Sequence, residues 1–212
     1  MARILVFGDS IAWGAWDVEG GWVQRLRKFL DEKTLSSNFL DYFSIYNLAF
    51  SGDTSTDILE RLEPEIKARL AEGHEIIILF SIGINDSFYL HDLKSNMVSL
   101  DKFKENIKKL IEIAKKFTDK IVFVGLTPID ETKVALIPWD TNKSYKNESI
   151  KKYDEIIKEV CQKNKILFIE IFDDWLNSDY KELLEDGAHP NSFGHQKLFE
   201  TIRDFLIKNK II

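Results

Sequence analysis

The fold is first indicated by residues 4–10, which read Ile4-Leu5-Val6-Phe7-Gly8-Asp9-Ser10. Four consecutive apolar residues that end at a glycine are typical of a buried strand followed by a tight turn. Four similar runs, rich in β-branched and aromatic residues, follow at residues 45–48, 76–82, 121–126 and 166–171. Strands this apolar are buried on both faces, as in a parallel sheet covered by helices.

Segments with helical periodicity separate these runs and follow the last one. Apolar residues recur three or four positions apart in residues 22–30, 103–114, 150–161 and 198–206. Residues 56–70 share this period, but Pro64 interrupts them, and we expect two short helices there, the second starting at Pro64. The alternation of strand and helix predicts an α/β fold, a three-layer α/β/α sandwich around a five-stranded parallel sheet. No linker or repeat is visible, so residues 1–212 are expected to form a single domain.

Composition and charge exclude several classes of protein. The 212 residues carry 29 Lys or Arg and 35 Asp or Glu, a net charge of -6, whereas a general nucleic-acid binder should be basic. The single cysteine, Cys161, excludes an intramolecular disulfide and a multi-cysteine zinc site, and we expect it in the core. No secretion signal is visible and no apolar run approaches the ~18 residues of a membrane span. These features predict a cytoplasmic protein without integral membrane association.

Reactive side chains follow the predicted strands. Ligands of an open α/β sheet bind outside the carboxyl ends of the strands. Residues 8–10 (Gly-Asp-Ser) follow the first run, residues 51–53 (Ser-Gly-Asp) the second and residues 83–86 (Gly-Ile-Asn-Asp) the third, while residues 186–190 (Asp-Gly-Ala-His-Pro) come after the fifth. A hydroxyl, an amide, a carboxylate and an imidazole at one rim are the parts of an acyl-transfer site.

The chemistry suggests a role for each of these groups. Ser10 would be the nucleophile, activated by His189 as the base, because a serine hydroxyl reacts poorly until a base takes its proton. Asp186, three residues before His189, would orient the imidazole. The main-chain N–H groups of Ser10 and Gly52 and the side-chain amide of Asn85 would stabilise the oxyanion.

The four blocks together resemble the SGNH hydrolases, also called the GDSL esterase/lipase family. Ser10, Gly52, Asn85 and His189 match the four residues after which that family is named, and residues 186–190 match its Asp-x-x-His-Pro motif. The resemblance implies a flavodoxin-like fold with strand order 2-1-3-4-5, hydrolysis of esters through an acyl-enzyme, and no required metal or other cofactor. We therefore expect a serine esterase of the carboxylesterase, acetylesterase or lysophospholipase type that acts on small, accessible esters, with acetyl-sized acyl groups favoured. The alcohol part of the ester could be a sugar, an aryl group, a lysophospholipid or a thiol.

A different function remains open at the same rim. Asp9, Asp86 and Asp186 all reach it, and clustered carboxylates can hold Mg²⁺. The alternative is thus a noncatalytic or Mg-dependent flavodoxin-like module that binds a small anion. That alternative leaves Ser10, Asn85 and His189 without a role. We expect Asp9 and Asp86 to stabilise turns instead.

Other polar and aromatic residues near these motifs have two interpretations. Trp13 and Trp16 follow the serine, and Trp139 lies in the long connection 128–146. They either pack in the core or line an acyl or alcohol pocket. His195, six residues after His189, is expected to be a surface or half-buried helix residue.

Overall fold

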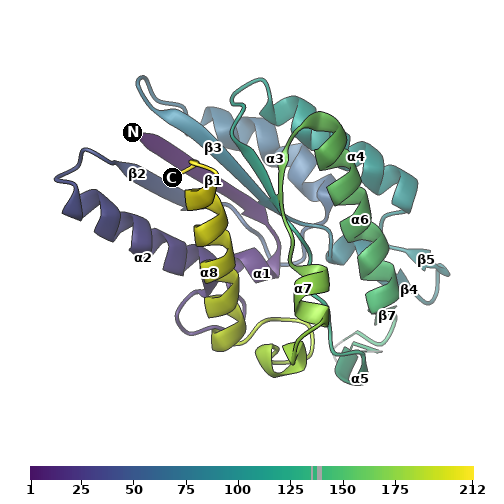
Figure 1. Ribbon diagram of the computed structural model, residues 1–212. Coiled ribbons are helices and arrows are strands. Elements are labelled where there is room, and N and C mark those ends of the chain that lie inside the picture. The colour runs from purple at the N-terminus through teal and green to yellow at the C-terminus, as the bar shows by residue number, and fades with distance from the viewer. Residues whose placement is uncertain (135, 138–139) are drawn as a thin grey trace.

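A computed structural model of the chain describes residues 1–134, 136–137 and 140–212 (Figure 1). Its centre is a parallel sheet in the order β2-β1-β3-β6-β8, which confirms the predicted strand order. The strands are β1 (Ala2–Gly8), β2 (Phe43–Asn47), β3 (Glu75–Ser81), β6 (Ile121–Val124) and β8 (Leu167–Ile169). Each lies within or beside one of the five apolar runs.

The middle of the sheet is buried because both faces are covered. Ile4 of β1 pairs with Ile45 of β2 on one side and Ile77 of β3 on the other. Helices α2 and α8 pack together on one face, and α3, α4 and α6 form a row on the other (Figure 1). This arrangement confirms the three-layer α/β/α sandwich. The long helices are α2 (Gly21–Ser36), α3 (Ser55–Lys67), α4 (Leu100–Ala114), α6 (Asn147–Asn164) and α8 (Ser192–Lys208).

The prediction of two helices around Pro64 is wrong, because α3 runs through the proline without a break. A proline removes one helical hydrogen bond and crowds the carbonyl four residues earlier. Here Ile58, Leu62 and Ile66 lie on one face of α3 and are fully buried. Since that face spans Pro64 and the helix ends three residues after it, packing outweighs the lost bond. The capping box between Thr54 and Asp57 also holds the start of α3.

Two long connections carry short elements that periodicity could not predict. Residues 128–146 contain α5 (Glu131–Val134) and β7 (Lys143–Ser144), and residues 172–191 contain α7 (Phe172–Leu176) and the 3-10 helix η2 (Tyr180–Leu183). Strand β7 joins β4 (Tyr89–Leu90) and β5 (Ser95–Asn96) in a small antiparallel sheet of order β5-β4-β7. This sheet fixes the first connection beside the carboxyl end of β3. No helix in the described parts of the chain has the length and apolar character needed to cross a membrane.

Candidate active site

Ser10 is the first residue of α1 (Ser10–Trp13), the short helix that follows β1. The Asp9 carboxylate caps this helix and accepts a hydrogen bond from the Ile11 main-chain N–H at 3.0 Å. A helix leaves its first N–H groups without partners inside the helix. The turn therefore places the Ser10 hydroxyl and its N–H together at the carboxyl edge of the sheet.

Ser10, His189 and Asp186 lie in an unbroken line of contacts. The Ser10 Oγ is 2.9 Å from Nε2 of His189, and Nδ1 of His189 is 2.7 Å from Oδ2 of Asp186. Oδ1 of Asp186 accepts from the main-chain N–H groups of Ala188 at 2.9 Å and His189 at 2.8 Å. The connection 172–191 thus returns to β1 and joins residues that are 179 positions apart in the chain.

The charge of Asp186 is stabilised where it lies. Burial by itself raises the pKa of this carboxyl group, but hydrogen bonds from His189 and Ala188 outweigh burial and hold the pKa well below its usual value. Asp186 is therefore ionised at neutral pH. An ionised carboxylate beside Nδ1 favours the tautomer that carries its hydrogen there and leaves Nε2 free to accept a proton from Ser10.

Gly52 and Asn85 line the same cavity as Ser10 and His189. Gly52 has a φ of 94°, a left-handed conformation that glycine adopts without strain, and a Cβ added there would meet no atom within 4 Å. Asn85 begins the 3-10 helix η1 (Asn85–Ser87) after β3, and its Nδ2 donates to the Asp53 carbonyl at 2.9 Å. One hydrogen of this amide group is used there, and the group has two.

Tyr145 is a site residue that the sequence did not reveal. Its hydroxyl donates to Oδ1 of Asn85 at 3.2 Å, and its ring packs on Phe88 with centroids 4.3 Å apart. Burial raises the pKa of Tyr145 well above its usual value, so the hydroxyl keeps its proton and remains a donor. Apart from its position in a long connection, a lone tyrosine carries no signal of such a role.

The cavity beside Ser10 has a volume of about 300 Å³. Its walls combine polar groups from the strand ends with aromatic and apolar side chains that lie directly beside the strands of the small sheet. The lining residues are Ser10, Trp16, Ser51, Gly52, Thr54, Asn85, Phe88, Met97, Lys143, Tyr145 and His189. This volume lies at the lower end of the range for ligand pockets. The cavity therefore suits a small molecule.

The outcome differs for the three tryptophans that could line a pocket. Trp16 lines the cavity beside Ser10, whereas Trp13 lines a separate hollow of about 530 Å³ along α2 and β2. Trp139 lies outside the described residues. The hollow at Trp13 is larger than the cavity at Ser10, but none of Ser10, Asp186 and His189 reaches it.

The carboxylates of Asp9 and Asp86 make hydrogen bonds that stabilise turns. The Asp86 carboxylate accepts from the main-chain N–H and the hydroxyl of Ser55 and so joins η1 to the start of α3. Burial raises the pKa of Asp9 to about 7 and that of Asp86 to about 6. Among the described residues, no group of three His, Cys, Asp or Glu side chains is placed to hold a metal ion. The contacts of these carboxylates do not favour the Mg-dependent alternative.

The expectation for His195 is wrong, because its side chain is fully buried. It lies on the inner face of α8, where an added Cβ at Gly21 would come within 3.5 Å of its Cε1. Burial lowers the pKa of His195 to about 4, so the ring is neutral. A periodic pattern does not show which helical polar residue faces a neighbouring glycine, and this one packs between α8 and the start of α2. Cys161 is buried as expected.

Known proteins were compared with the chain in sequence and in structure. Residues 6–197 match the sequence profile of the GDSL-like lipase/acylhydrolase family. A GDSL esterase/lipase of Arabidopsis thaliana is 29% identical over 196 residues, a match that covers 88% of this chain and 58% of the plant protein. The isoamyl acetate-hydrolyzing esterase of Saccharomyces cerevisiae is 24% identical over 221 residues, covering 96% of this chain and 87% of the yeast protein.

A solved structure shares the architecture over nearly the whole chain. The lipase/acylhydrolase of Enterococcus faecalis superposes with a TM-score of 0.72 at 23% identity. The match covers 97% of this chain and 95% of the other. At this identity the likeness supports the fold.

Proposed function

The chain belongs to the GDSL-like lipase/acylhydrolase family and is an ester hydrolase, and from this premise we propose that it cleaves small carboxylic esters through an acyl-enzyme on Ser10. The observation that carries the proposal is the contact line from Ser10 through His189 to Asp186 at the edge of a cavity. We further propose that residues 1–212 act as a single domain, since Ser10, Gly52 and Asn85 follow three neighbouring strands of one sheet. The connection after the last strand of that sheet brings His189 to Ser10.

The first half of the reaction forms the acyl-enzyme. Ser10 Oγ attacks the carbonyl carbon of the ester while Nε2 of His189, 2.9 Å away, takes the hydroxyl proton. The tetrahedral intermediate collapses, and the alcohol leaves with the proton that His189 then donates. Asp186 stabilises the imidazolium that exists between these two transfers. Water completes the cycle by attacking the acyl-enzyme with His189 again as the base.

The oxyanion of the intermediate needs donors on the other side of the carbonyl. We assign this role to the N–H groups of Ser10 and Gly52 and to Nδ2 of Asn85, which line one cavity. Tyr145 holds Oδ1 of Asn85 and the Asp53 carbonyl holds one hydrogen of Nδ2. These two bonds orient the amide before substrate arrives, and a donor that is already oriented costs no reorganisation during the reaction.

A small ester is the substrate class that suits the cavity. A volume of about 300 Å³ accommodates a short acyl group and a modest alcohol, and the relative from Saccharomyces cerevisiae is named for the hydrolysis of an acetate ester. The aromatic and apolar wall of Phe88, Met97 and Tyr145 would contact the apolar part of the substrate.

The test is the labelling of Ser10 by a fluorophosphonate probe, together with hydrolysis of p-nitrophenyl acetate. Ser10→Ala should lose labelling and about 10⁴- to 10⁶-fold in kcat, the scale seen when a serine nucleophile is removed. Ser36→Ala, an exposed serine of α2, is the matched control and should behave as the wild type. EDTA should leave the rate unchanged. A folded, active Ser10→Ala enzyme, or one inactivated by EDTA, would overturn the proposal.

A further inference from the structure

The indole of Trp16 lies against the Asp186–His189 pair. Its Nε1 is 2.9 Å from Oδ2 of Asp186 and 3.1 Å from Nδ1 of His189, and the two rings meet edge to face with centroids 5.7 Å apart. We propose that Trp16 is a positioning residue that holds the Asp186 carboxylate and, through it, the imidazole of His189. This inference rests on the proposed function, in which His189 is the base.

The hydrogen bonds of Asp186 show what Trp16 adds. An ionised carboxylate has about four acceptor positions. Oδ1 accepts from two main-chain N–H groups, those of Ala188 and His189, while Oδ2 faces Nδ1 of His189 and Nε1 of Trp16. The indole N–H is only a donor, so with a hydrogen on Nδ1 of His189 its acceptor is Oδ2. Trp16 thus supplies the fourth donor and prevents the carboxylate from turning away from the imidazole.

The conformation of Trp16 indicates that packing alone does not explain its position. The residue has a φ of 65°, in the left-handed region that is unfavourable for a tryptophan. The residue is 61% exposed, so burial provides little compensation. Strained residues of this kind gather at functional sites, where the surrounding structure holds them. The contact with Asp186 and His189 is the polar interaction that the strained conformation makes possible.

A buried ion pair beside Trp16 holds its loop. Asp17, the next residue, is 7% exposed, and its carboxylate accepts hydrogen bonds from the N–H groups of Glu19 and Gly21 and from the guanidinium of Arg25. Burial raises the pKa of Asp17, but the bonds from Arg25 and the main chain outweigh it and lower the pKa to about 2. Asp17 is thus charged across the working pH range, and the loop 14–20 is closed around it.

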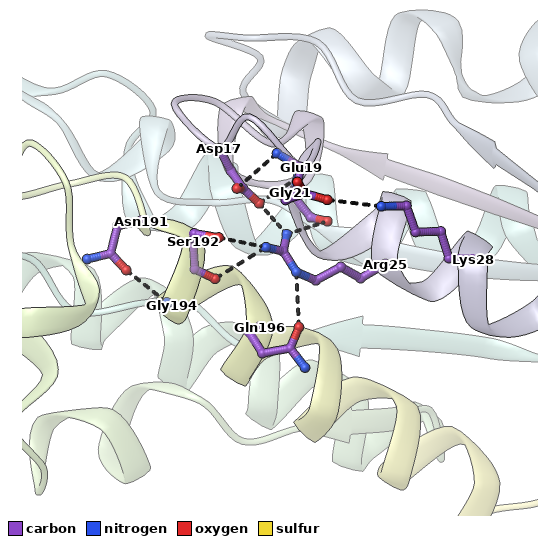
Figure 2. A network of polar contacts seen from close by, with 9 residues as sticks. All are labelled: Asp17, Glu19, Gly21, Arg25, Lys28, Asn191, Ser192, Gly194 and Gln196. Carbon is purple, nitrogen blue, oxygen red and sulfur yellow. Dashed lines mark hydrogen bonds and ion pairs between the residues drawn. The ribbon is translucent and has the colours of Figure 1, made fainter.

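Arg25 also joins this loop to the segment that carries His189. Figure 2 shows its guanidinium between Asp17 and the start of α8. It donates to the Ser192 hydroxyl at 2.9 Å and to Oε1 of Gln196 at 3.1 Å. Ser192 follows His189 by three residues. The same arginine therefore fixes both sides of the Trp16 contact, the loop that presents the indole and the helix start that follows the histidine.

The competing interpretation is that Trp16 only lines the cavity and contacts substrate. The two interpretations predict different kinetics. A wall residue that binds substrate and transition state equally changes KM alone, whereas a residue that orients the base changes kcat. They also differ in the free enzyme, because only positioning alters the hydrogen bond between His189 and Asp186 before substrate is present.

The experiment uses Trp16→Phe, which keeps an aromatic ring and removes the N–H. Trp13→Phe is the matched control, since Trp13 is similarly exposed but lines a different hollow. Hydrolysis of p-nitrophenyl acetate should show kcat reduced about 10- to 100-fold in Trp16→Phe with KM within about twofold, a change that matches one hydrogen bond to a charged group. The low-field proton resonance of His189 Nδ1–H should shift or broaden in Trp16→Phe and stay in place in Trp13→Phe.

Arg25→Lys tests the tether, because lysine keeps a charge beside Asp17 but cannot reach Asp17, Ser192 and Gln196 together. We expect a smaller loss of kcat, not additive with Trp16→Phe. A change confined to KM, or a Trp16→Phe enzyme with the kcat and Nδ1–H resonance of Trp13→Phe, overturns the inference. Additive losses of kcat in the double variant would show that Arg25 does not act through Trp16, and this part of the inference would be wrong. If Ser10→Ala stays active, the proposed function fails instead, whatever Trp16→Phe does.

Discussion

Tyr145→Phe removes a single hydroxyl group from the candidate site. That hydroxyl donates to Oδ1 of Asn85 at 3.2 Å, while the packing of the ring on Phe88 would remain in the variant. Because burial keeps the hydroxyl protonated, the wild-type bond is present over the whole working pH range. The substitution therefore isolates one question, namely how much the orientation of the Asn85 amide contributes to the rate.

The expected magnitude follows from the type of bond. A hydrogen bond between neutral groups contributes about 0.5–1.5 kcal/mol, which corresponds to about a 2- to 13-fold change in rate. A donor–acceptor distance of 3.2 Å lies just beyond the usual range of an O–H···O bond, so we expect about a threefold to fivefold loss of kcat. This is far below the 10²- to 10³-fold loss that follows removal of an oxyanion donor itself. KM should change little.

Steady-state hydrolysis of p-nitrophenyl acetate measures both constants. Tyr89→Phe is the control, since Tyr89 of β4 pairs with Ser144, the residue before Tyr145, and does not line the cavity at Ser10. An unchanged kcat in Tyr145→Phe would show that the Asp53 carbonyl alone orients the amide. A loss above 10²-fold would also refute the reasoning, because one neutral hydrogen bond cannot supply it.

Three further changes test the site and the core. Asn85→Ala should reduce kcat by about 10²- to 10³-fold with little change in KM; a change in KM alone would make Asn85 a substrate-binding residue. Asp186→Asn should lower kcat strongly while binding persists, because an amide can hold the wrong tautomer of His189, and near-normal rates across a pH series would exclude Asp186 as the orienting group. Asp154→Asn tests pH-dependent stability: burial raises the pKa of Asp154 to about 7 from 3.8, so its contribution to stability is complete below about pH 4 and is lost as the pH rises through 7. In urea titrations, the free energy of unfolding of the variant relative to the wild type should therefore rise by up to about 4 kcal/mol between pH 4 and pH 8. The amide of the variant can still accept the hydrogen bond from the Leu126 N–H. A parallel pH dependence in the two proteins would contradict this expectation.

The parts of the fold that the sequence predicted are those that depend on local patterns. A strand buried on both faces must be apolar along its length, and residues 76–82 have this pattern. The helix from Ser55 to Lys67 shows the limit of local rules, because the effect of Pro64 is local whereas the burial of Ile58, Leu62 and Ile66 is not.

The residues of the candidate site also differ in whether the sequence alone could identify them. Ser10 and Asn85 could be selected from the sequence because the carboxyl ends of parallel strands meet at one edge, so position after a strand is enough to bring them near each other. His189 lies in the connection 172–191 and could be selected by its spacing from Asp186 and by the family motif. Tyr145 and Trp16 could not be assigned their contacts, since each depends on how an irregular connection folds back. Such connections have no periodicity, and their course is set by bonds across the chain, such as the pairing of β7 with β4.

By itself, the sequence therefore determined the layers and the chemical groups at the rim, because hydrophobic periodicity and chain connectivity are sufficient for these. The strand order was implied by the resemblance to a known family. Only the tertiary structure decided which side chains hold those groups in place. The hydroxyl of Tyr145 on Asn85, the indole of Trp16 on Asp186, and Arg25 between Asp17 and Ser192 all join residues 8 to 170 positions apart. Hydrogen bonds form only within about 3 Å and in one direction, and a sequence pattern specifies neither distance nor direction between segments so far apart.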